Sequence, residues 1–231
     1  MLRSISGLQN YSVGAVDGPI GHVKDFYFDD DKWVIRYLVV DTGAWLSSRN
    51  VLISPITIGN ADWAAKLLPV SLTKRQVKDS LHIDTHKPVS HQHEKDHVGY
   101  YGHPVYRAEG VALLRSGTAV AHYRVHAIDG DIGHVHGLLI DEDCWAIRYL
   151  VVDTSNWWLG RKVLISPQWI SHAHWADSTV SVDLKREAVK HAPPYAPGSQ
   201  MDRDDEAGIY RHYGRPGYWA DESDRALRQA R

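Results

Sequence analysis

The chain contains one ten-residue segment twice: WVIRYLVVDT at residues 33–42 and WAIRYLVVDT at residues 145–154. Nine of the ten positions are identical, and the two segments stand 112 positions apart. In an extended strand, alternate side chains face opposite sides of a sheet. One face would carry Trp33, Ile35, Tyr37 and Val39, and the other Val34, Arg36, Leu38 and Val40. Both faces are mostly apolar, which predicts a central strand that is covered on both sides.

The same shift of 112 positions aligns far more than this segment. Residues 17–55 align with residues 129–167 without a gap, and Leu-Arg-Ser at 2–4 recurs at 114–116. Near the end of each copy, Tyr-Gly-x-Pro-x-Tyr at 101–106 recurs at 213–218. A period of this length is a whole domain rather than one turn of a solenoid. We therefore expect a tandem duplication, with repeat one at about 2–106 and repeat two at about 114–219.

Each repeat has the pattern of a small all-β domain. Asp17-Gly18 and Asp129-Gly130 are strong hairpin turn signals, and short runs such as VLISP and LLPVSL are typical of brief strands. Short helices are expected in TKRQVKDS, with Thr73 as N-cap, and in KREAVKH. Segments rich in proline and polar residues follow, with a short helix ended by Gly214 in the last of them. The predicted boundaries are 1–81 and 114–193 for the two barrels, 82–113 for a His-rich extension and linker, and 194–231 for a C-terminal extension.

Composition limits the classes of protein to which the chain can belong. Hydrophobic residues make up 43% and charged residues 23% of the 231 residues, as in a globular protein. The net charge of −2 lacks the basic field that nucleic-acid binding needs, so no nucleic-acid partner is expected. Cys144 is the only cysteine, so no intrachain disulfide can form. No apolar run reaches the roughly 20 residues of a membrane span, and we expect a cytoplasmic protein.

Three blocks in order resemble the PRC-barrel domain: Asp-Gly-x-Ile-Gly-x-Val, the Trp-x-Ile-Arg-Tyr-Leu-Val-Val-Asp-Thr strand, and Val-Leu-Ile-Ser-Pro. That domain forms the cytoplasmic part of the photosynthetic reaction centre H subunit and the C-terminal half of a bacterial ribosome-maturation factor. The resemblance implies a mainly β protein with two tandem small barrels, each followed by a short helix and an irregular extension. It also implies docking onto larger assemblies, and it supplies no catalytic motif. Repeat one departs from the pattern at Arg107, where repeat two has Trp219.

The arginine in each copy of the ten-residue segment has two possible roles. In the structural role, Arg36 and Arg148 reach the rim of the barrel or pair with a carboxylate, such as Asp41 or Asp17 for Arg36. In the functional role, they bind an anion or a carboxylate of a partner. We favour the structural role, because charged side chains on covered strands are usually paired.

The loop after each copy of the segment is the best candidate for a binding surface. Tryptophan and arginine dominate interface hot spots, and both occur here in GAWLSSR and SNWWLGR. The alternative is that these side chains cover an open end of the barrel or the other repeat. The complete predicted interaction surface is Arg36, Trp45, Arg49, Arg148, Trp157, Trp158 and Arg161.

Histidines crowd the extension of repeat one, and imidazoles so placed can ligate zinc, nickel or copper. The members are His82, His86, His91, His93, His97 and His103. The shift turns His91 into Arg203 and His93 into Asp205, and no cysteine supports the set. We therefore expect no metal site and no cofactor.

A non-enzymatic protein-binding or scaffold module is the function that this pattern favours, with an unknown protein partner and a possible homo-oligomer. The resemblance offers an alternative, a peripheral subunit of a photosynthetic or electron-transfer membrane complex. An RNA- or ribosome-associated assembly factor and a metal-binding protein rank lower.

Overall fold

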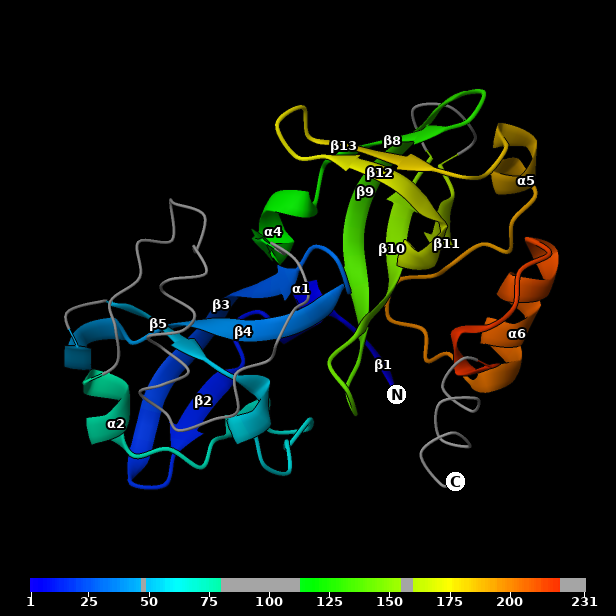
Figure 1. The fold of residues 1–231 in the computed structure, drawn as a ribbon. Helices are drawn as coiled ribbons and strands as arrows, with labels where there is room; N and C mark the ends of the chain where they lie inside the picture. Colours follow the sequence, from blue (N-terminus) through cyan, green and yellow to red (C-terminus); the bar gives the residue numbers. More distant parts are fainter. Residues whose placement is uncertain (47–48, 80–112, 155–159, 221–231) are drawn as a thin grey trace, which may run out of the picture. The chain divides into compact units, whose positions relative to one another are not determined.

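The computed structural model describes residues 1–46, 49–79, 113–154 and 160–220 (Figure 1). The described chain is mainly β, with two sheets and a few short helices. The mainly β prediction is therefore confirmed. No helix within the described ranges combines the length and the apolar character that crossing a membrane requires.

The first sheet has six strands in the order β5-β4-β3-β2-β6, with β7 paired to β3. Its pairs are antiparallel except β2 with β6. The strands are β2 (Ser12–Ala15), β3 (Gly18–Asp29), β4 (Val34–Asp41), β5 (Asn50–Ile53), β6 (Leu67–Pro69) and β7 (Leu114–Ser116). The ten-residue segment thus supplies β4, an interior strand that pairs with β3 and β5 and lies second in the order, whereas β3 holds the central place.

The second sheet repeats this arrangement with the strands of repeat two. Its order is β11-β10-β9-β8-β13-β12, with β1 paired to β9. The strands are β1 (Leu2–Ser4), β8 (Arg124–Ala127), β9 (Gly130–Asp141), β10 (Ile147–Asp153), β11 (Lys162–Ile165), β12 (Ile170–His174) and β13 (Thr179–Val182). Tyr149, Leu150 and Val152 of β10 are fully buried, so this copy of the segment is also a core strand.

The start of β4 and of β10 differs from the prediction. Trp33 and Trp145 have φ angles of 54° and 59°, in the left-handed region, and therefore lie in the turn before each strand. In repeat one the Asp29 carboxylate accepts hydrogen bonds from the N–H groups of Asp31 and Lys32, which tightens the turn that Trp33 ends. Trp33 is buried and stacks on Phe28 with ring centroids 4.9 Å apart, whereas Trp145 is half-buried.

The two copies of the segment meet at these turns. Val34 and Ala146 form an isolated antiparallel bridge. The Ile35 N–H donates to the Trp145 carbonyl over 2.9 Å, and the Ile147 N–H donates to the Trp33 carbonyl over 2.7 Å. The duplicated segments therefore hydrogen-bond to each other at their first residues.

Short helices follow or connect the strands. Thr73 caps α2 (Lys74–Lys78) in a reciprocal capping box with Gln76, which confirms the predicted N-cap. The others are α1 (Ile5–Leu8), η1 (Gly43–Leu46), η2 (Pro55–Thr57), α4 (Gly117–Val120), η3 (Pro167–Trp169), α5 (Arg186–Lys190) and α6 (Arg203–His212).

The C-terminal extension is more ordered than the predicted irregular segment. Its ten-residue helix α6 begins with a capping box between Asp202 and Asp205 and buries Glu206, Ile209 and Tyr210. Gly214 follows with a φ of 64°, so the predicted helix that is ended by this glycine is confirmed. Buried side chains on one face give this helix a packing role that loop composition did not indicate.

The compact units of the chain do not follow the boundary between the repeats. One unit contains Arg3–Ala121 and Ile140–Ile147, and the other contains Met1–Leu2, His122–Leu139 and Arg148–Arg231. Within the first unit, β7 of repeat two extends the edge of β3, with Leu114 opposite Asp29. The Arg115 guanidinium pairs with Asp30 over 2.8 Å, and Ser116 donates to Asp25 over 2.5 Å. Residues from repeat two thus complete the sheet of repeat one.

Candidate functional site

Arg36 on β4 forms an ion pair inside repeat one. Its Nη2 lies 2.8 Å from Oδ2 of Asp29, and the two side chains are only 12% and 5% exposed. A carboxylate partner is thus confirmed, but the predicted partners Asp41 and Asp17 are wrong. Their carboxylates accept backbone N–H groups instead, from Gly43 and Lys74 respectively. Asp41 thus stabilises the turn that follows β4, and Asp17 accepts from the first residue of α2.

The environment of Asp29 sets the charge of this pair. Burial alone would raise the pKa of Asp29, but the hydrogen bond from Arg36 and those from the N–H groups of Lys32 and Asp31 lower it below its ordinary value. A carboxyl whose pKa is lower in the folded state stabilises the protein above its unfolded pKa. That contribution is lost as the pH falls through the folded pKa.

Replacing Arg36 with alanine is expected to lower the free energy of unfolding by about 2 kcal/mol at pH 7, because a buried charged acceptor loses its strongest partner. The loss should shrink at low pH, because without Arg36 the buried Asp29 carboxyl is protonated more readily, which removes the charge that lacks its partner. Urea unfolding at pH 7 and pH 3 measures both values. Arg75→Ala, at a side chain that is 91% exposed, serves as the control and should change little at either pH. An equal loss for Arg36→Ala at both pH values would contradict the ion-pair account.

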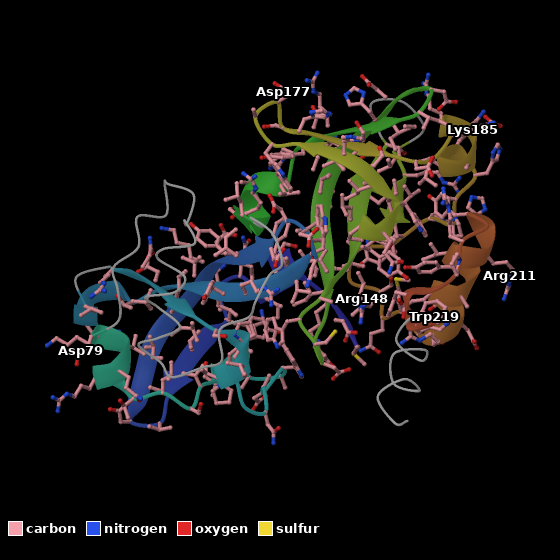
Figure 2. All side chains as sticks on the ribbon, viewed as in Figure 1. Asp79, Arg148, Asp177, Lys185, Arg211 and Trp219 are labelled. Carbon is pink, nitrogen blue, oxygen red and sulfur yellow. The ribbon has the colours of Figure 1, made fainter. Side chains whose placement is uncertain are left out.

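Arg148, the counterpart of Arg36, lies in a different environment. Its guanidinium carbon stands 3.8 Å from the centroid of the Tyr218 ring, a cation–π contact. Figure 2 labels Arg148 near Trp219, the residue that follows Tyr218. The same position of the repeat therefore contacts a carboxylate in one copy and an aromatic ring in the other.

Sequence reasoning missed a buried polar cluster next to Arg148. The Glu206 carboxylate is 4% exposed and accepts hydrogen bonds from the hydroxyl groups of Tyr149 (2.9 Å) and Tyr218 (3.0 Å). Arg203 approaches it to 3.3 Å from the first turn of α6. Burial and the nearby Glu206 charge raise the pKa values of Tyr149 and Tyr218, so both hydroxyl groups remain protonated donors. The cluster fixes α6 on β10, which indicates a structural role.

The loop after β4 is held against its own sheet. The indole N–H of Trp45 donates to the Ile20 carbonyl, and Lys74 lies over the Trp45 ring at 4.7 Å. Arg49 donates to the Lys78 carbonyl over 3.1 Å, while its own carbonyl accepts from Thr42. Trp45 is half-buried, so part of the ring remains accessible next to the Lys74 ammonium group.

The counterpart loop in repeat two is only partly described. Thr154 donates to the Arg161 carbonyl, as Thr42 does to that of Arg49. Trp157 and Trp158 lie outside the described residues, as does the whole His-rich segment from His82 to His103.

A polar hollow opens beside η1 in the first unit. Its volume is about 530 Å³. Its lining residues are Gln9, Asn10, His22, Val23, Lys24, Asp41 and Gly43. His22 and Lys24 are both exposed on β3, and Lys24 lies at the register shift between Val23 and Asp25. The hollow combines an amide, an imidazole, an ammonium group and a carboxylate, a set suited to hydrogen bonding with a polar partner surface.

Repeat two carries a different set at the equivalent positions. His122 and His136 stand in place of Asn10 and Lys24, whereas His134 matches His22. Partial burial and the nearby Lys162 charge lower the pKa of His136. The Asp153 carboxylate has the opposite effect but does not outweigh them. The two repeats thus present different chemistry on the same framework.

Comparison with known proteins supports the resemblance for the first repeat. A protein of Deinococcus radiodurans that is described only as uncharacterised is 43% identical over 60 residues. The match covers 26% of this chain, and the chain spans about a fifth of that relative's length (21%). The family model of the PRC-barrel domain matches residues 4–87, so a PRC-barrel domain is found in this part of the chain.

Proposed function

We propose that the protein is a non-enzymatic protein-binding module, and that a partner docks on the face of repeat one around the polar hollow. The observation that carries the proposal is the hollow itself, which Gly43 at the start of η1 helps to line, with the exposed His22 and Lys24 on strand β3. Binding sites built on strands hold their side chains more precisely than sites on loops. A half-buried tryptophan next to cationic side chains is typical of an interface anchor.

The PRC-barrel domain at residues 4–87 supports a general docking role but names no partner. Shared folds host unrelated functions, so the partner must be identified by its binding to this particular face. In this proposal repeat two is a second barrel of the same kind, which carries its own side chains on the equivalent surface.

The test is affinity capture with the tagged full chain in its native host, with captured proteins quantified by mass spectrometry. The double variant His22→Ala/Lys24→Ala should lower recovery of a specific partner about tenfold or more, because loss of about 1.4 kcal/mol changes affinity tenfold. The matched control is His191→Ala/Arg211→Ala, which removes one exposed histidine and one exposed cation from the other unit. Circular dichroism verifies that both variants fold.

Equal recovery of every captured protein with both variants would overturn the proposed face. The identity of the partner separates the alternatives. Reaction-centre or light-harvesting chains would indicate a peripheral subunit of a photosynthetic complex, and ribosomal proteins would indicate an assembly factor.

A further inference from the structure

Strand β12 presents two parallel imidazoles on one face. His172 and His174 are two positions apart, and both are exposed. Their ring centroids are 6.0 Å apart, with an interplanar angle of 13°. Ala173 between them pairs with Val180, which is fully buried, so the histidines lie on the outward face of the sheet.

The fold does not require this pair. The equivalent positions in repeat one are Asn60 and Asp62, and the first sheet forms without imidazoles there. Exposed histidines also add nothing to the apolar core of the second sheet. Their placement therefore points to a role outside the packing of the chain.

Two imidazoles at this spacing can hold one divalent transition-metal cation. At a Zn–N distance of about 2.0–2.1 Å, tetrahedral coordination would bring the two ring centroids to roughly 5 Å. A change of side-chain torsion angles that moves the two rings about 1 Å closer gives that separation. Such changes are accessible, because exposed side chains interconvert readily between rotamers.

One chain, however, supplies too few ligands. Among the described residues, no three histidine, cysteine or acidic side chains are grouped so that they could hold a metal ion. His126 lies in the same cross-strand row as His172, through Ser181, but it is paired with Asp131. Zinc in a structural site takes four protein ligands, so His172 and His174 make half of such a site.

The position of β12 allows a second chain to supply the other half. β12 is the terminal strand in the order of its sheet. Edge strands are where a second chain can approach a sheet. We infer that His172 and His174 from two copies of this chain together bind one zinc-class cation, and that the cation links the copies into a dimer.

Light scattering after size-exclusion chromatography tests this inference on the full chain, with Zn²⁺ or with EDTA. We expect a monomer in EDTA and a dimer in Zn²⁺. The variant His172→Asn/His174→Asn should remain monomeric in Zn²⁺. In isothermal titration calorimetry its stoichiometry should be lower than that of the wild type by about one Zn²⁺ for every two chains, because two chains share one cation. The control His122→Asn/His191→Asn also removes two exposed histidines and should dimerise as the wild type does.

All three proteins keep the His-rich segment, so zinc bound there cancels in the comparison. The inference is overturned if Zn²⁺ leaves the mass of the wild type unchanged, or if the His172→Asn/His174→Asn variant dimerises equally well. A difference of one whole Zn²⁺ per chain without dimerisation would also overturn it.

Discussion

Replacing Gly133 with alanine is expected to lower the free energy of unfolding by about 3–5 kcal/mol, through backbone strain and steric overlap together. Gly133 has a φ of 133°, a conformation that side chains with a Cβ rarely adopt. A Cβ at this position would also stand 2.0 Å from the carbonyl oxygen of Asp153, at the end of β10. Urea unfolding followed by tryptophan fluorescence measures the loss.

Gly137 provides the control on the same strand β9. A Cβ there meets no atom within 4 Å, so Gly137→Ala should change stability by no more than about 1 kcal/mol. Equal losses for the two variants, or a loss below about 1 kcal/mol for Gly133→Ala, would contradict this explanation. The counterpart Gly21 has the same close approach, 1.9 Å to the Asp41 carbonyl oxygen. The second glycine of the Asp-Gly-x-Ile-Gly motif therefore serves strand packing rather than phosphate binding.

Replacing Glu206 with alanine is the second change with a large expected effect. The hydroxyl groups of Tyr149 and Tyr218 would lose their acceptor while they remain buried. Each unsatisfied buried group costs about 1–3 kcal/mol, so the total loss should be about 3–5 kcal/mol. Limited proteolysis should then cleave within α6, because the carboxylate holds this helix on β10.

Asp204→Ala is the matched control on the same helix. Asp204 is exposed in the first turn of α6, and its loss should change stability by roughly 0.5 kcal/mol. If Glu206→Ala is as mild as Asp204→Ala, or leaves α6 resistant to protease, the cluster does not fix the helix.

The sequence predicted features that depend on local patterns. The Asp-Gly turns, the strand with two apolar faces and the Thr73 cap each rest on residues close together in the chain. Three-residue strands such as β7 carry too little periodicity to reveal their partner, so the pairing of β7 with β3 was missed. The left-handed Trp33 was missed because alternation of side-chain types does not report backbone dihedral angles.

The site was predicted less completely than the fold. The pairing of Arg36 with Asp29 depends on register shifts between β3 and β4, one of them at Tyr27/Phe28. Glu206 joins Tyr149 only after α6 packs on the sheet, 57 positions away in sequence. The hollow is lined by residues from three separate segments, which come together only in the folded chain. One sequence signal pointed to the hollow: its positions carry different side chains in the two repeats, such as Lys24 in repeat one and His136 in repeat two.

Hydrogen exchange of the full chain, alone and with its captured partner, tests the proposed docking face most directly. Slower exchange is predicted in peptides that contain Gln9–Asn10, His22–Lys24 and Gly43–Leu46, which surround the hollow and Trp45. Unchanged exchange in all three, with protection confined to α6 or to the strands of repeat two, would contradict it.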